Sequence, residues 1–224
     1  MSTESPFETA GVPAVLPRGP HGLDRDVVMA SQRGRLLTAF VDEASEQGYH
    51  SVTIADVVAR AGTAKRTFYE HFRDKEDCFV EAFKAGTTIV ISAIVRAGDA
   101  ADDPIERIEV GVRAYLDALI EIPNFARLLL TDVIGGGAPV ARRWMRWMEL
   151  LADGLIAWRN ESRLNHPDLP EITKMQAVTV LSGINELLRW EIERVGVDGI
   201  SAVADELIDT AIGLLTADVS HHER

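Results

Sequence analysis

Apolar residues recur at intervals of three and four positions in one segment of this chain after another. The segment before Gly48 shows this spacing most clearly, because one side of a helix there would carry Leu36, Leu37, Phe40, Val41 and Ala44. A half-buried strand would instead alternate apolar and polar residues, and no segment sustains that alternation. The sequence therefore predicts an all-α protein.

Stretches rich in glycine, proline and asparagine divide this pattern into about nine helices. Thr53 followed by Asp56 predicts a capping box at the second helix, and Gly48 and Gly62 predict the ends of the first two. We expect helices from about 24 or 31 to 47 and at about 53–61, 63–71, 75–96, 104–121, 123–133, 138–164, 170–195 and 200–218.

The chain has 224 residues and a formal charge of −12. Such an acidic protein should not coat nucleic acid or anionic lipid indiscriminately, although it can carry a small basic face. Its single cysteine, Cys78, cannot form a disulfide within the chain, which fits a reducing compartment. Because we see neither a run of about 18 apolar residues nor a signal peptide, we expect a cytoplasmic protein with no membrane partner.

The stretch GTAKRTFYEHF, residues 62–72, departs from this acidic background. On a helical wheel Phe68 falls on one side, while Lys65, Arg66 and Tyr69 fall on the other. Residues 60–75 hold five cations and two anions, so this region is locally basic. A short turn with a glycine before a helix of this kind is the arrangement of a helix-turn-helix, whose second helix enters the major groove. The alternative is an amphipathic hairpin with ordinary surface charge.

Residues 35–83, RLLTAFVDEASEQGYHSVTIADVVARAGTAKRTFYEHFRDKEDCFVEAF, resemble the DNA-binding domain of the tetracycline-repressor (TetR) family. The resemblance implies a three-helix DNA-binding domain over 24–74 and a helical effector-binding and dimerisation domain over 75–219. A flexible arm over 1–23 and a tail over 220–224 would flank them. For the arm we expect either a disordered tail or a contact of its basic residues with the minor groove.

The resemblance also implies roles for single residues. Lys65 and Arg66 occupy the positions that usually meet base edges, and Arg66 replaces a small residue, so it reads a base or reaches a phosphate. Contacts to the phosphate backbone are implied for Thr53, Tyr69, His71 and Lys75, and contacts to a base methyl or a phosphate for Thr67. Where the family often has a capping serine this chain has Ala64, so we expect Thr63 to cap the third helix.

The stretch RRWMRWMELLADGLIAW, residues 142–158, places three indoles along one broad helical face. These side chains fill the core or line an apolar effector cavity, and the resemblance to ligand-controlled regulators favours the cavity. The residues expected to form this pocket are Trp144, Trp147, Met148, Leu151, Trp158, Asn185 and Arg189.

The family resemblance further implies a homodimer through the helices at about 170–195 and 200–218, because two recognition helices read a palindromic operator. The predicted function is a DNA-binding transcriptional regulator, a repressor released from its operator by a small apolar or amphipathic effector. An enzyme is not expected, because the six histidines show no metal-binding spacing, and no cofactor or metal is predicted. The alternative is a helical, dimeric interaction module that kept the fold but lost control by DNA or ligand.

Overall fold

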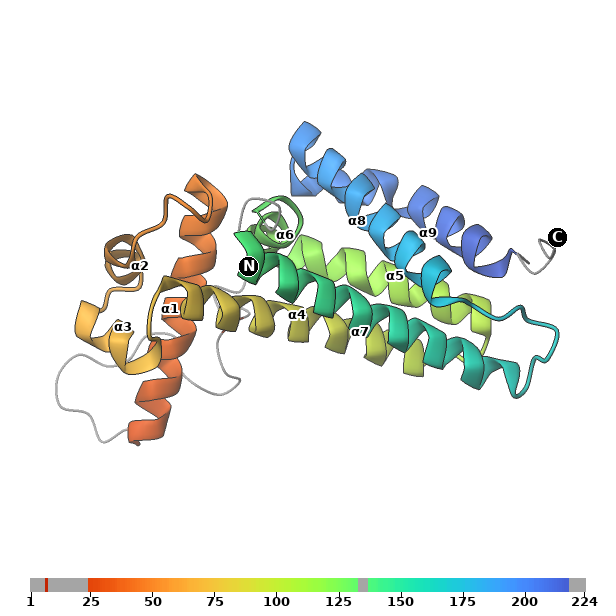
Figure 1. The fold of residues 1–224 in the computed structure, drawn as a ribbon, viewed down its shortest axis with the longest axis horizontal. Coiled ribbons are helices and arrows are strands. Elements are labelled where there is room, and N and C mark those ends of the chain that lie inside the picture. Colours follow the sequence, from red (N-terminus) through yellow and green to blue (C-terminus); the bar gives the residue numbers. More distant parts are fainter. Residues whose placement is uncertain (1–6, 8–23, 133–136, 218–224) are drawn as a thin grey trace.

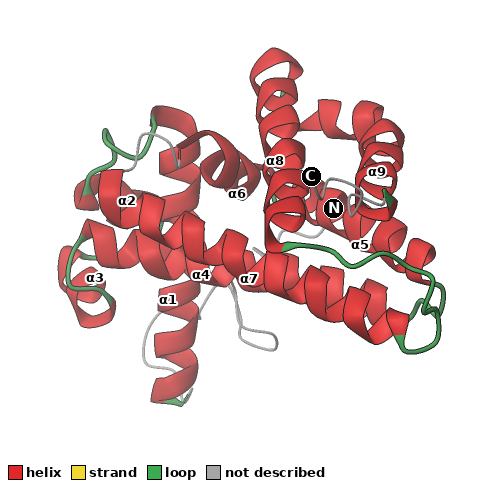
Figure 2. Cartoon of the chain, turned by 45° about the vertical axis from the view of Figure 1, so that its right-hand side comes forward, coloured by secondary structure: helices red, strands yellow, loops and turns green. Residues whose placement is uncertain are grey.

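The computed structural model describes residue 7 and residues 24–132 and 137–217. These residues form helices joined by loops, with no strand among them, so the predicted all-α class is confirmed (Figure 2). The helices are α1 (Arg25–Gln47), α2 (Ile54–Arg60), α3 (Lys65–His71), α4 (Lys75–Asp99), α5 (Pro104–Glu121), α6 (Pro123–Arg127), α7 (Gly137–Arg163), α8 (Lys174–Val195) and α9 (Ile200–Thr216).

Helices α1, α2 and α3 form a small unit at one end of the molecule, which we call the reading head (Figure 1). Helix α4 leaves this unit and runs beside α5 and α7, while α9 packs on α5 and α8 packs on α7 and α9. The expected arm 1–23 and tail 220–224 lie outside the described residues, apart from Phe7. The Phe7 ring packs edge-on against Phe125, with 5.9 Å between centroids.

Aromatic side chains hold the reading head together. Phe40 of α1 packs against Phe79 of α4 at 6.0 Å between centroids, and Phe68 packs against Phe72 at 5.4 Å. All four rings are almost completely buried. Fully burying a phenylalanine contributes about 1.5–3 kcal/mol, so this cluster alone can seat α3 firmly.

Local capping chemistry sets the starts of the helices in this unit. Thr53 and Asp56 form the predicted capping box, with the Thr53 N–H donating to Asp56 at 2.9 Å. The expected cap at Thr63 is wrong, because Ala64 occupies the cap position and no side chain bonds there. The Thr63 N–H instead donates to the Val58 carbonyl at 2.9 Å, which draws its hydroxyl into a buried position.

Helix α4 is long and apolar enough to span a membrane by length and composition alone. Its apolar character has a different explanation here, because it packs against α1, α5 and α7. Cys78, near its start, is completely buried, and this burial raises the pKa of the thiol. Further along, Gly86 meets Phe125 and Gly98 meets Trp158, so a methyl group at either position would lie within 2.4 Å of an aromatic ring.

Two expected elements differ in the structure. The helix expected at 123–133 divides into α6 and a π turn, Leu128–Asp132. The helix expected from about 170 begins at Lys174, because Thr173 and Gln176 form a second capping box. A capping box satisfies otherwise unpaired N–H groups and so sets the first turn, which explains the later start.

Candidate nucleic-acid interface and effector cavity

Helix α3 presents a basic face to solvent. Phe68 is fully buried, while Lys65 and Arg66 are exposed and Tyr69 keeps 58% of its surface. The turn before α3 contains Gly62 with a φ of +62°, a backbone conformation that favours glycine. The structure therefore brings Lys65, Arg66 and Tyr69 together on one open face, as the helical wheel predicted.

Two further polar residues of α3, Thr67 and Glu70, lie next to this face. Arg66 donates from Nε to Glu70 at 3.2 Å, and its side chain stays 92% exposed. Exposed pairs of this kind contribute about 0–1 kcal/mol, so Arg66 can leave Glu70 at little cost. Thr67 is half-buried at the edge of the face.

Thr53 lies at the start of α2, the helix that precedes the turn. Its hydroxyl donates to Asp56 at 2.6 Å and accepts from the Asp56 N–H at 3.3 Å. These bonds from Thr53 lower the pKa of the Asp56 carboxyl, so this carboxylate stays ionised next to the helix start. The Thr53 side chain is therefore occupied within the protein, and the exposed groups at this end include the first backbone N–H groups of α2.

His71 is half-buried at the end of α3, with its Nε2 3.4 Å from the Gln32 side-chain oxygen. Burial lowers the pKa of His71, and the positive charge of Arg33 lowers it further. The imidazole is therefore mainly neutral at pH 7. A neutral His71 still offers a ring N–H as a hydrogen-bond donor.

Lys75, at the start of α4, is tied to the loop between α1 and α2. Its Nζ donates to the Tyr49 carbonyl at 3.0 Å and to the His50 carbonyl at 3.1 Å. The same ammonium lies 4.8 Å from the centroid of the Tyr49 ring. Lys75 therefore joins α4 to the reading head, and an ammonium has one more N–H than these two bonds use.

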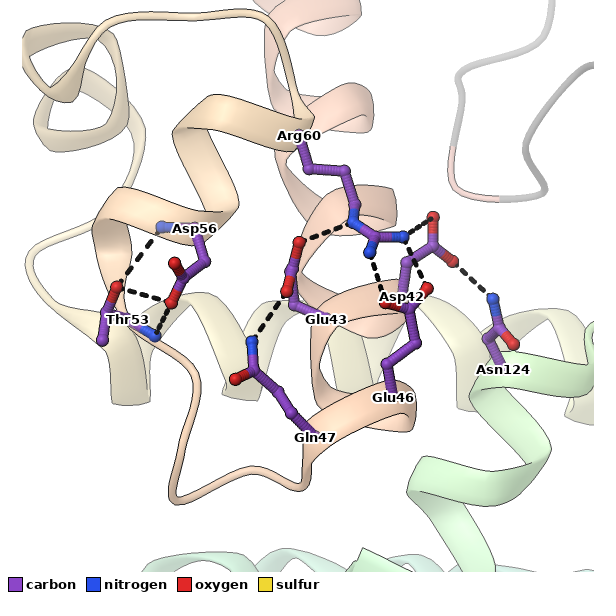
Figure 3. Close-up of polar contacts among 8 residues, drawn as sticks. All are labelled: Asp42, Glu43, Glu46, Gln47, Thr53, Asp56, Arg60 and Asn124. Atoms are coloured by element: carbon purple, nitrogen blue, oxygen red, sulfur yellow. Dashed lines mark hydrogen bonds and ion pairs between the residues drawn. The ribbon is translucent and has the colours of Figure 1, made fainter.

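The sequence did not reveal a polar network between α1, α2 and α6 (Figure 3). Arg60 of α2 donates from Nε to Glu43 at 2.6 Å and lies 3.9 Å from Asp42. On the other side of Asp42, the Asn124 amide of α6 donates to this carboxylate at 2.6 Å. Asn124 also accepts a hydrogen bond from Ser45 at 3.1 Å, so it links α6 to α1. The partners lie about 80 positions apart in the chain, so no local pattern signals this contact.

An apolar cavity of about 260 Å³ lies between α4, α5, α7, α8 and α9. Three predicted pocket residues, Leu151, Trp158 and Asn185, line it. The Tyr115 hydroxyl donates to Asn185 at 2.6 Å at its wall, and burial raises the pKa of Tyr115. The helical wheel did not identify Tyr115, because this residue comes from α5.

A second cavity of about 350 Å³ lies beside the π turn and contains two further predicted residues, Trp144 and Arg189. Asn185 lines both cavities. Arg189 is paired with Glu186 and, at 3.0 Å, with Glu193. Trp147 and Met148 line neither cavity: both are buried, and the Trp147 ring packs between Trp144 and Tyr115.

The outer surfaces of α8 and α9 carry large exposed apolar side chains. Trp190 keeps 59% of its surface and Leu214 keeps 50%, and Leu187 is also exposed. Gly183 and Gly213 have open space where a side chain would be. Other apolar residues of these two helices are buried within the chain, including Ile184, Leu188, Leu207 and Leu215.

No group of three or more metal-ligating side chains occurs within the part of the chain that the structure describes.

Comparisons with known proteins point to regulation of transcription. The HTH-type transcriptional activator FasR from Mycolicibacterium smegmatis is 28% identical over 101 residues, 45% of this chain and 46% of its own length. The uncharacterized HTH-type transcriptional regulator YdgC from Bacillus subtilis is 39% identical over 49 residues, 22% of this chain and 25% of its own length.

Solved structures share the fold over most of the chain. The fatty acid degradation regulator FadR from Bacillus halodurans has a TM-score of 0.71 at 15% identity, covering 81% of this chain and 95% of its own. FadR from Bacillus subtilis, in complex with stearoyl-CoA, has a TM-score of 0.69 at 16% identity, covering 80% of this chain and 96% of its own. At these identities the likeness concerns the fold alone.

The matching sequence region is the reading head and its junction with α4. The chain spans less than half of the length of the curated relatives that it matches. Residues 36–82 match the model of the bacterial regulatory proteins of the tetR family. This part of the chain therefore carries a domain that matches the tetR family of bacterial regulatory proteins.

Proposed function

We propose that this protein is a homodimeric transcriptional regulator that binds a palindromic operator through α3 and leaves it when a small effector binds. The observation that carries the proposal is the exposed face of α3. Lys65, Arg66 and Tyr69 lie on it while Phe68 seats the opposite side in the core. Side chains on a seated helix can reach base edges in the major groove. Such a regulator works in the cytoplasm, where bacterial DNA lies.

Within this proposal the contacts divide into two kinds. Lys65 and Arg66 meet base edges, where a bidentate arginine–guanine contact discriminates by about 1–3 kcal/mol. The phosphate backbone is held by Tyr69, by the His71 N–H and by the remaining N–H of Lys75. Thr53 contributes through the start of α2, whose free N–H groups attract an anion. Thr67, at the edge of the face, contacts a base methyl or a phosphate.

The dimer forms through α8 and α9. Trp190, Leu187 and Leu214 would bury apolar surface that a monomer leaves in water. Gly183 and Gly213 let backbones approach closely where helices cross. A two-fold axis then relates the two α3 helices, which matches the symmetry of a palindrome.

The effector binds in the apolar cavity of about 260 Å³. Its lining is apolar except at Tyr115 and Asn185, so the effector is apolar or amphipathic. FadR from Bacillus subtilis has a similar fold and was solved with stearoyl-CoA, which supports a ligand with an alkyl chain. To release DNA, the effector must bind the DNA-incompetent form better, with a typical coupling of about 1–3 kcal/mol. If the DNA-bound protein represses transcription, its release from DNA ends repression. If the DNA-bound protein activates transcription, its release ends activation.

Selecting bound duplexes from a random pool with the purified protein tests the proposal. We expect a palindromic motif whose half-sites lie about one helical turn apart. Arg66→Ala should relax one position in each half-site if Arg66 reads a base, and otherwise should weaken all duplexes alike. If no duplex is enriched and none binds at low salt, the protein is instead a helical interaction module, and the DNA-binding proposal is wrong.

A further inference from the structure

Ile108, Leu155 and Trp158 are among the residues that line the apolar cavity. The same three residues also line a small hollow of about 10 Å³. Arg107 and Arg159 line this hollow as well. Two guanidinium groups therefore line a hollow that shares three residues with the wall of an apolar cavity.

Arg159 is unusual because it is a buried cation, with only 4% of its surface exposed. Its Nη2 donates to the Leu215 carbonyl at 3.0 Å and its Nη1 to the Pro170 carbonyl at 3.5 Å. Within the described residues no carboxylate lies within ion-pair distance of it. Burial lowers the pKa of Arg159, and the nearby Arg163 lowers it further. Because a buried charge without a counter-ion is costly, this site favours an incoming anion.

Arg107 adds a second guanidinium with hydrogen-bonding capacity to spare. Its Nε is buried and has no hydrogen-bond partner. Its Nη1 is 3.2 Å from Glu161, whose side chain is 66% exposed. The guanidinium lies over the ring of Trp158, a lining residue of the apolar cavity, at 5.9 Å from its centroid. Arg107 therefore lies beside a wall residue of the cavity, and Glu161, its carboxylate partner within the described residues, can swing away into solvent.

We propose that the cavity binds an aliphatic carboxylate, with its alkyl chain along the apolar walls and its carboxylate on Arg107 beside Arg159. The carboxylate takes the unpaired Nε–H and a neighbouring N–H of Arg107, the bidentate geometry that a guanidinium favours. The Glu161 carboxylate moves into solvent, and the ligand's charge compensates Arg159. This inference deepens the effector half of the proposed function and rests on it.

The size and charge of the two spaces select this ligand class. An apolar cavity of about 150 Å³ already holds a benzene molecule, so the 260 Å³ here accommodate a longer hydrocarbon chain. The hollow lined by the two arginines has about the volume that one water requires, so only a compact head group suits it. A nucleotide-bearing thioester is too large for it, and an alcohol would leave Arg159 without a counter-ion.

Isothermal titration calorimetry tests the inference by measuring the affinity of the full chain for sodium decanoate and for decan-1-ol. We expect decanoate to bind at least about tenfold more tightly than the alcohol, because it alone makes charge-assisted hydrogen bonds. Arg107→Gln should lose about that factor for decanoate and leave the alcohol unchanged, while Arg107→Lys should lose less. Arg113→Gln is the matched control, because Arg113 lies on the same helix and pairs on the surface with Glu109 and Asp205.

Three outcomes would overturn the carboxylate site. Two concern a wild type with a normal unfolding transition: equal affinity for decanoate and the alcohol, or no binding of either. The third is an equal loss of both ligands in an Arg107→Gln variant that unfolds at the wild-type midpoint. Duplex binding is measured separately, so a protein that binds decanoate through Arg107 but selects no DNA contradicts the proposed function and not the site.

Discussion

At the scale of single residues, the cations near the proposed DNA surface fall into two groups. Lys65 and Arg66 are exposed, and Arg66 has only a weak ion pair. Arg60 and Lys75 are held by groups of the protein itself, Arg60 by carboxylates of α1 and Lys75 by two loop carbonyls. The exposed group can adapt to a base sequence, whereas the held group shapes the surface on which DNA would lie.

Replacing Lys75 with methionine separates its two roles. The change removes two hydrogen bonds from an ammonium to carbonyls, so the free energy of unfolding should fall by about 1–3 kcal/mol in urea titrations. If Lys75 also contacts a phosphate, every duplex should bind more weakly and the salt slope should fall by about 1. Lys84→Met, at an exposed position of the same helix, is the control. A less stable variant with an unchanged salt slope would show that Lys75 is purely structural.

His71 should make the stability of the protein depend on pH. Because its pKa is lowered in the folded state, the unfolded chain binds the proton more tightly. The resulting stabilisation is present above the ordinary histidine pKa of about 6.5 and is lost as the pH falls through the lowered value. When the pH is lowered from about 7.5 to about 5, the free energy of unfolding measured in urea should therefore fall more for wild type than for His71→Gln. Equal losses in both proteins would mean that His71 is not desolvated.

At the scale of elements, α6 and its π turn connect the two halves of the molecule. Asn124 bonds to α1, and the neighbouring Phe125 packs on Gly86 of α4. The π turn that follows supplies Leu129 and Leu130 to the second cavity. π turns are frequent at functional sites. A change at the second cavity thus has a short physical route to the reading head.

Gly86→Ala should disturb this contact. Its new methyl group would lie 2.3 Å from the Phe125 ring, which is fully buried, so overpacking should cost about 1–3 kcal/mol of unfolding free energy. Gly154→Ala, at an open helical position, should instead stabilise by about 0.4–1 kcal/mol. Adding Phe125→Leu to Gly86→Ala should recover part of the loss in a double-mutant cycle. Strict additivity in urea titrations would rule out the contact as the cause.

Several local features were predicted correctly from the sequence, although the cap at Thr63 and the start of α8 were not. The capping box at Thr53 and the seating of Phe68 depend on residues within a few positions, and both appear as expected. The sequence could not predict which tryptophan side chains of α7 line a cavity and which pack in the core. A helical wheel identifies the buried face of a helix but not the helix that covers this face. For the same reason the bonds of Lys75 and Asn124, which join distant segments, were not foreseen.

At the scale of the whole molecule, the described part of this acidic chain presents a basic face on α3 and exposed apolar residues on α8 and α9. The formal charge of −12 repels DNA from most of the surface, which favours approach through α3. The exposed apolar residues of α8 and α9 offer a place where two copies can meet. Both features suit a protein that binds DNA only in one orientation and in pairs.

Trp190→Arg tests the pairing. In a monomer this position is 59% exposed and accommodates arginine, whereas in a dimer interface an unpaired charge costs several kcal/mol. Sedimentation analysis should therefore give a dimer for wild type and a monomer for the variant, with unchanged helical circular dichroism. Leu164→Arg, at an exposed position after α7, should leave the dimer intact. A variant that remains dimeric would place the interface elsewhere.

The complete burial of Cys78 has a practical consequence. A thiol that solvent does not reach, and whose pKa is raised, presents almost no thiolate to a maleimide or methanethiosulfonate reagent. A spin label or fluorophore attached to a cysteine introduced on the surface of α3 would then mark that position alone. The separation of the two α3 helices in a dimer becomes measurable in solution, with and without effector, while the native thiol stays in place.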